Sequence, residues 1–467
     1  MSTTDDTKQI IEAPPAEGIV ADQSPQFDDD DDGQAPVIVK NAPLAPAKKG
    51  KSRHRDVMGL TTPHKLSAFL IVICMAAFCC GISGWSSVNL MRETLTDIGK
   101  HAIPSSLCVE EIRALLTEMN TNAIDEFLAR TESGQKAARI AYRQNEDTVT
   151  GLLVAAASDV TYGAQDMAEI KAILGQIHEY IGLIEIARAY NDMHSELAPQ
   201  ALIHASDHMQ HGVLKLVDAL NELRRTRLIR LYEEKVAQLN KYIQFTFGSG
   251  LILLSTLVLA QVYTKHKTRR FLNLSLVFAT VACLSAVVLF CLCMKKDMAS
   301  LTAAKSDVYD KMIVLWQVRS TANDANGLES LYLVGSEKKK YADAFQQKIE
   351  SIRRKSVAHW SANVFAEKWD SYLRLDAEIR ALETSGKHDQ AIDLCLGTEV
   401  NQSERAFKNF NDKIAVFLET EQSSLQVTID KATNSLKWMD YGAVLLAFCI
   451  PGFAWLGLRA RLKEYGW

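Results

Sequence analysis

Four long apolar segments restrict what this chain can fold into. They run from Leu66 to Leu90, Tyr242 to Tyr263, Leu272 to Met294 and Met439 to Leu458. A helix that crosses a bilayer needs about 20 residues, and one charge at its centre costs about 2.5–3.5 kcal/mol on insertion scales. Asp440, at the edge of the last segment, is the only charged residue in the four segments, which also contain no histidine. The sequence therefore predicts four transmembrane helices.

Basic clusters flank these segments and predict their orientation. "KKGKSRHR" precedes the first segment, "KHKTRR" joins the second and third, and "RARLK" follows the fourth. Four spans place all three clusters on one side, and Lys and Arg near spans stay in the cytoplasm. We therefore expect cytoplasmic termini, a cytoplasmic basic loop over 264–271 and a cytoplasmic end over 459–467. The first segment starts too far into the chain, and is too long, for a cleavable signal peptide.

Residues 1–63 differ from the rest in composition. They are rich in Pro, Asp, Ala and Gln and contain an acidic run from Asp28 to Asp32. Such a segment buries too little apolar surface to offset chain entropy, which predicts a disordered cytoplasmic tail. We favour a solvated spacer over a docking segment.

The two long loops, 92–241 and 295–438, are predicted to lie outside the cell. Both contain almost no proline and repeat apolar residues at a period near 3.6, as in Val109, Ile112 and Leu116. Each loop leaves the membrane and returns to it, so an even number of helices is required. At about 1.5 Å per residue, each loop fits four helices of roughly 30–40 residues. The predicted fold is all-α, with four transmembrane helices and two extracytoplasmic up-and-down four-helix bundles.

The polar sequence next to the second and third spans contains no helix breaker. The helices of the bundles should therefore continue into the membrane, which would allow mechanical coupling. The two halves also look duplicated, because Arg113 and Asn120 recur as Arg319 and Asn326 at a fixed offset of 206. This pattern predicts an internal repeat of a span–bundle–span module.

The candidate site lies in the second bundle. Trp316, Arg319, Asn323 and Asn326 share one helix face, and Glu329 extends it. Arginine suits a carboxylate and tryptophan supplies an apolar wall, so the set could bind a small anionic ligand such as an amino acid. The alternative, which we favour, is a buried network with Arg319 paired to an acid on a neighbouring helix. A weaker version in the first bundle contains Arg113, Thr117 and Asn120.

Three histidines and one proline could also serve a function. His204, His208 and His211 share a helical face, but their spacing is awkward for one tetrahedral metal and the face is predicted to be solvated. We therefore expect no metal site. Pro451, near the middle of the fourth span, predicts either a hinge or a tolerated kink.

A family resemblance extends this interpretation. "DKMIVLWQVRSTANDANGLESLYLVG", "HDQAIDLCLGTEVNQSERAFKNFN" and "IEIARAYNDMHSELAPQALIHASDHMQHGVL" resemble segments of actinobacterial GlnX-type membrane proteins. The family's pattern maps onto one set of residues in each half: Trp316, Arg319, Ala325, Asn326, Glu329 and Ser330, and Ala187, Arg188, Ala189, Asn191, Ala205, Ser206 and Met209. The resemblance implies a bacterial cytoplasmic membrane protein that relays amino-acid availability from a glutamine-binding-type lipoprotein to a cytoplasmic Ser/Thr kinase.

The leading hypothesis is therefore a non-enzymatic transmembrane sensor of a glutamate- or glutamine-type signal. A direct chemoreceptor-like ligand binder and a structural envelope scaffold are the alternatives. The sequence contains no nucleophile elbow, phosphate-binding loop or HExxH motif, so we expect no enzymatic activity, no cofactor and no nucleic-acid partner. Whether the chain forms a homo-oligomer is left open.

Overall fold

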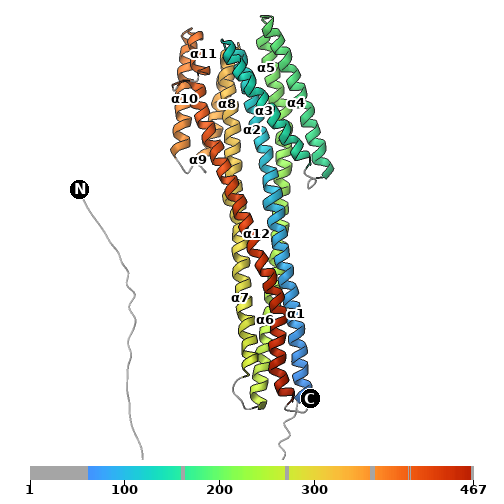
Figure 1. The fold of residues 1–467 in the computed structure, drawn as a ribbon. Coiled ribbons are helices and arrows are strands. Elements are labelled where there is room, and N and C mark those ends of the chain that lie inside the picture. Colours follow the sequence, from blue (N-terminus) through green and yellow to red (C-terminus); the bar gives the residue numbers. More distant parts are fainter. Residues whose placement is uncertain are drawn as a thin grey trace, which may run out of the picture. The chain divides into compact units, whose positions relative to one another are not determined.

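The computed structural model describes residues 62–158, 163–268, 273–357, 363–397, 399 and 401–463 (Figure 1). Within them every regular element is a helix, and four of the helices are long and apolar enough to cross a membrane. This confirms the predicted all-α membrane fold. Most of the predicted tail, part of the basic loop (269–271), the first residue of the predicted third span (Leu272) and the last four residues of the predicted cytoplasmic end lie outside the described residues. The exact limits of the spans stay predictions.

The chain runs twice through a similar series of helices. The first half contains α1 (Thr62–Thr94), the π-helical segment η1 (Leu95–Ala102), α2 (Ile103–Leu128), α3 (Glu132–Ser158), α4 (Gly163–Asp192), α5 (Ala198–His208), η3 (Met209–Val213) and α6 (Leu214–Thr268). The second contains α7 (Leu274–Ala303), η4 (Ala304–Tyr309), α8 (Asp310–Val334), α9 (Lys338–Val357), α10 (Asn363–Thr384), α11 (His388–Leu396) and α12 (Ser403–Lys463). η1 and η4 occupy corresponding places in the two halves. The short helix α11 was not predicted, and α3, α9 and α10 are shorter than the expected 30–40 residues.

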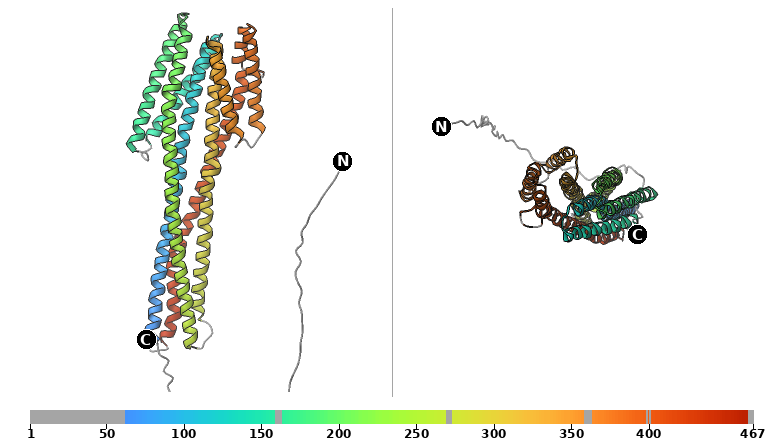
Figure 2. Two further views of the ribbon diagram at one scale, coloured as in Figure 1. Left: turned by 180° about the vertical axis from the view of Figure 1, so that it is seen from behind. Right: turned by 90° about the horizontal axis from the view of Figure 1, so that it is seen from above.

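The four predicted spans lie in α1, α6, α7 and α12, which pack side by side (Figures 1 and 2). Their shared core consists of small and aliphatic side chains such as Ile73, Leu257 and Ala454. Large apolar side chains on the outside of these helices stay exposed, among them Phe78 at 58% and Phe448 at 71%. An apolar exterior of this kind suits contact with lipid, because lipid tails are as apolar as these side chains.

A charged pair explains the one acidic residue in the predicted spans. Asp440 of α12 accepts a hydrogen bond from Arg92 of α1, and Arg92 also reaches the Leu436 carbonyl oxygen at 3.4 Å. Each charge therefore has a partner close to where the apolar segments end, which lowers the cost of placing it there.

The helices continue from the spans into the polar region, as the sequence predicted. α6 is a single helix of 55 residues. α7, η4 and α8 follow one another without a break, because the residues that join them keep right-handed helical backbone angles. Pro451 lies inside α12, which continues on both sides of it. The hinge role of Pro451 stays a prediction.

The two polar regions share a core instead of forming two separate bundles. α2 of the first half packs along α8 of the second, and buried residues from both halves, including Ile103, Trp316 and Phe410, belong to one apolar cluster. α2 and α8 are therefore buried on most of their surface. Gly327 on α8 lets the two helices approach closely, because a Cβ atom there would lie 2.9 Å from the Thr121 side chain.

Candidate functional site

The contact between α2 and α8, here called the seam, contains polar groups that bond across it. The Thr121 hydroxyl donates to the Asn323 carbonyl oxygen at 3.0 Å. The Asn323 amide donates to the Ala114 carbonyl oxygen at 3.2 Å, and the Ser330 hydroxyl donates to Asp125 at 2.6 Å. Because buried polar groups are costly unless they are paired, these bonds fix the register of the two halves.

The duplicated arginines also reach across the seam. Arg113 of α2 binds Asp218 of α6 at 2.6 Å and donates to Ser320 of α8. Arg319 of α8 binds Glu118 of α2 at 3.3 Å. Both arginines therefore have an acidic partner on a neighbouring helix, the arrangement expected of a network that holds helices together.

Arg319 is further held by two neighbours. Its Nε atom donates to the Asn411 side chain of α12 at 2.8 Å. Its guanidinium lies over the Trp316 ring, 5.4 Å from the ring centre. These contacts fix the direction of the guanidinium, and the remaining N–H donors are the groups that could hold a carboxylate.

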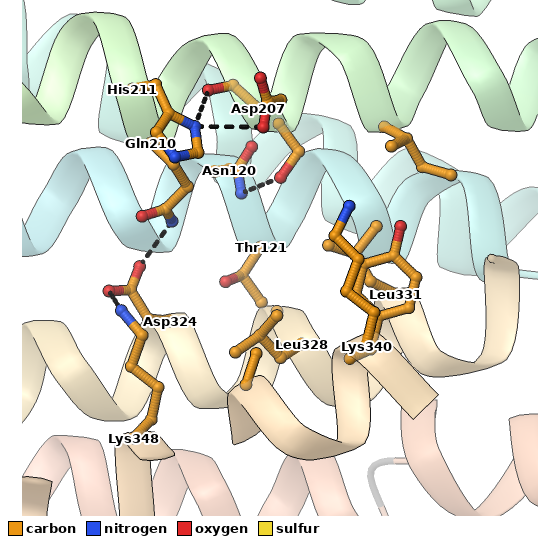
Figure 3. Close-up of a pocket in the computed structure, with 15 residues that line it drawn as sticks. Asn120, Thr121, Asp207, Gln210, His211, Asp324, Leu328, Leu331, Lys340 and Lys348 are labelled. Atoms are coloured by element: carbon orange, nitrogen blue, oxygen red, sulfur yellow. Dashed lines mark hydrogen bonds and ion pairs between the residues drawn. The ribbon is translucent and has the colours of Figure 1, made fainter. Parts of the chain in front are cut away.

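One cavity, here called the lysine cavity, lies on one side of the seam and has a volume of about 350 Å³ (Figure 3). Lys348 of α9 pairs with Asp324 of α8 at 2.7 Å, and Gln210 of η3 donates to the same carboxylate at 3.0 Å. Leu328 and Leu331 form part of its apolar lining. The other lining residues are Asn120, Thr121, Ile203, Ser206, Asp207, His211, Gly327, Lys340, Tyr341 and Ala344.

A second cavity, here called the arginine cavity, has a volume of about 190 Å³. It lies among α2, α3, α8 and α12. Its lining residues are Glu118, Thr121, Asn122, Asp125, Ala141, Arg319, Asn323, Asn326, Glu404, Phe407, Lys408, Asn411 and Asp412. This lining is far more polar than that of the lysine cavity.

The internal repeat relates the two cavities. Asn120 and Asp324 in the lysine cavity correspond, at the offset of 206, to Asn326 and Glu118 in the arginine cavity. On the returning helices a constant offset of 201 applies, and it relates Ile203, Ser206, Asp207, Gln210 and His211 to Glu404, Phe407, Lys408, Asn411 and Asp412. The cavities thus occupy equivalent places and have diverged in chemistry.

The predicted site residues are divided among three cavities, the apolar core and a buried acidic cluster. Arg319, Asn323 and Asn326 line the arginine cavity, and Asn120 lines the lysine cavity. Arg113 lines a third cavity of about 220 Å³ with Glu110, Asp218, Asn221, Gln317, Thr321 and Lys355. Trp316 is 6% exposed and belongs to the apolar core. Gln210, Lys348 and Asn411 were missed, and only the second offset of 201 could have pointed to Gln210 and Asn411.

Glu329 lies outside the three cavities, in a buried acidic cluster. Burial and the neighbouring carboxyl of Asp376 raise its pKa to about 8, although the nearby hydroxyl groups of Tyr372 and Ser403 oppose the shift. Burial likewise raises the pKa of Asp125, beside Glu404. Burial therefore favours protonated carboxyl groups in the cluster, and a cation placed beside them would favour their charged form.

The three histidines have separate surroundings. The His208 ring lies 3.9 Å from Glu179, His211 pairs with Asp207 at 3.1 Å, and His204 is exposed. Among the described residues, no group of three or more His, Cys, Asp or Glu side chains has the geometry to hold a metal ion. Leu202, on the same helix, is buried in the core.

The fold and the cavities describe a multi-span helical membrane protein with a large polar helical region joined directly to its spans. Residues 94–233 match the family model of the Actinobacterial sensor domain. The match covers η1 to the middle of α6, which is the polar part of the first half, and it supports an actinobacterial sensor protein. No significant match was found among curated proteins or solved structures.

Proposed function

We propose that this protein is a non-enzymatic transmembrane sensor that receives its signal in the polar helical region outside the cell. One observation carries the proposal: the helices that form the seam, α2 and α8, continue through η1 and η4 into the predicted spans in α1 and α7. A change at the seam can therefore reach the membrane without crossing a loop. The match to a sensor domain over residues 94–233 agrees with this role.

We further propose that the signal is an amino acid of the glutamate or glutamine type, read by a solute-binding lipoprotein and relayed to a cytoplasmic Ser/Thr kinase. The resemblance to GlnX-type proteins supports these partners. The test is crosslinking and affinity purification from native membranes, combined with growth of a deletion strain on glutamate or glutamine. We expect both partners to co-purify and growth to change. Absence of both partners together with unchanged growth would exclude the relay.

The orientation can be tested separately. We propose that the polar helical region is extracytoplasmic and that both termini are cytoplasmic, on the basis of the basic clusters. In a variant without its nine native cysteines, Glu196→Cys between α4 and α5 should react in intact cells with a membrane-impermeant maleimide. The matched control His266→Cys, at an exposed position near the C-terminal end of α6, should react only after the membrane is permeabilised. The reverse pattern would contradict the orientation.

A direct chemoreceptor-like ligand binder is a second candidate. The arginine cavity favours it, because Arg319 and several uncharged and acidic groups converge there. The two candidates differ in whether an amino acid binds the chain itself or only a binding protein.

A further inference from the structure

The arginine cavity contains a buried acceptor that has no donor. Asn323 is 1% exposed, and its amide nitrogen donates to the Ala114 carbonyl oxygen. Among the described residues, no donor lies within hydrogen-bond distance of its Oδ1 atom. An unpaired buried amide oxygen is costly, so a ligand that donates a hydrogen bond there would recover that cost.

Carboxylates outnumber cations around the same cavity. Glu118, Asp125, Glu404 and Asp412 line it, against Arg319 and Lys408. Lys408 and Asp412 are exposed at the rim, whereas Asp125 is buried. A donor that suits both an amide oxygen and nearby carboxylates is a cationic N–H group, such as an ammonium.

Arg319 supplies the opposite charge a short distance away. Asn411 and Glu118 hold it in place, and its guanidinium has further N–H donors for a planar carboxylate. Arg319 and Asn323 are one turn apart on α8, about 6 Å along the helix axis. Side chains one turn apart lie on the same helix face, so both groups can contact one small molecule.

We infer that the arginine cavity binds a small zwitterion directly, with its carboxylate on Arg319 and its ammonium on Asn323 Oδ1 and the adjacent carboxylates. The volume of about 190 Å³ limits the ligand to the size of an amino acid. This inference rests on the proposed sensor function and specifies its second candidate, in which the chain itself binds the amino acid. A ligand in this position contacts α2, α8 and α12, which all continue into spans.

The lysine cavity provides an internal comparison. Leu328, Leu331 and Ile203 stand where the arginine cavity has Asn122, Asp125 and Glu404. These apolar side chains cannot accept a hydrogen bond from an ammonium. The zwitterion should therefore bind only one of the two related cavities.

The test is isothermal titration calorimetry of the full chain in lipid nanodiscs, with each common L-α-amino acid as a probe. We expect at least one to bind. Its N-acetyl derivative lacks the ammonium and its C-terminal amide lacks the carboxylate, so each should bind at least about tenfold more weakly. An affinity that stays unchanged when either charge is removed would overturn the inference, as would the absence of binding by every probe.

Two pairs of variants locate the site. Arg319→Gln and Asn323→Leu should each weaken binding at least about tenfold. Gln210→Leu and Lys348→Met, in the lysine cavity, should leave affinity within about twofold. Thermal melting without ligand identifies a variant that fails to fold. If one of the two arginine-cavity variants does not fold, the other alone is sufficient for the test. Wild-type affinity in a folded Arg319→Gln or Asn323→Leu protein would contradict the assignment.

The outcome is separable from the proposed function. If no amino acid binds the chain while the lipoprotein and kinase still co-purify with it, the inference fails and the relay stands. If an amino acid binds but deletion leaves growth unchanged, the cavity is a binding site and the proposed amino-acid relay fails.

Discussion

Gly327 of α8 packs directly against Thr121 of α2 at the centre of the seam. A Cβ atom on Gly327 would lie 2.9 Å from the Thr121 Oγ1 atom. That hydroxyl cannot turn away without loss, because its one hydrogen is shared between the carbonyl oxygens of Thr117 and Asn323. The close approach of the two halves therefore depends on a residue without a side chain.

We predict that Gly327→Val destabilises the protein by about 1–3 kcal/mol, because a side chain must separate α2 from α8 or break the Thr121 bonds. Gly182 in α4 is the matched control, since a Cβ there meets nothing within 4 Å. Gly182→Val should leave stability unchanged or raise it, because valine favours a helix more than glycine does. Thermal denaturation of the two variants measures both effects, and equal melting temperatures would contradict the close seam.

A buried ion pair ties α4 to α2 in the first half. Arg188 and Glu126 bond at 2.6 Å with side chains 6% and 5% exposed. Arg188→Met should cost about 3–5 kcal/mol, because it leaves a buried carboxylate with one partner fewer. The double variant Arg188→Met/Glu126→Gln should recover at least half of that loss in denaturation experiments. Arg353→Met, at an exposed arginine, should change stability by less than about 0.5 kcal/mol.

The acidic cluster predicts a pH dependence of stability. The folded-state pKa of Glu329 is about 8, above its ordinary value of 4.5, so the folded chain keeps a proton that the unfolded chain loses between these values. The free energy of unfolding should therefore fall as pH rises through this range, by up to about 1.4 kcal/mol per pH unit.

Glu329→Gln should reduce this slope and stabilise the protein at pH 8, because glutamine stays neutral. Some slope should persist, since burial raises the pKa of Asp376 and Asp125 in the same direction. Denaturation at pH 5 to 9 provides the measurement, with Glu132→Gln at the exposed start of α3 as the control. A wild-type stability that rises with pH would refute the assignment.

The fold followed from local patterns. Long apolar segments without charges predicted the spans, and the 3.6-residue period with few prolines predicted the helices that continue from them. The pairing of Asp440 with Arg92, and the packing of α2 on α8, join residues far apart in sequence. Periodicity within one segment carries no information about such partners.

The candidate site was predictable only in part. Arg319, Asn323 and Asn326 share a helix face, so one segment sufficed to group them. The lysine cavity depends on Gln210 meeting Asp324 and on Lys348 reaching from α9. Glu329 continues the predicted face by sequence spacing, but it lies instead among Tyr372, Asp376 and Ser403, on helices whose position the sequence did not indicate.

Spin labels can test whether the seam is coupled to the predicted cytoplasmic ends of the membrane-spanning helices. In nanodiscs, one pair of labels at His266 and Arg459 reports on the ends of α6 and α12, and a second pair at Glu179 and Arg374 reports on the separation of the two halves. Pulsed electron–electron double resonance would measure both label distances with and without the Gly327→Val substitution, in a protein whose native cysteines have been replaced. If the seam is coupled to the spans, both distance distributions shift together. A shift at Glu179 and Arg374 with an unchanged distribution at His266 and Arg459 would contradict it.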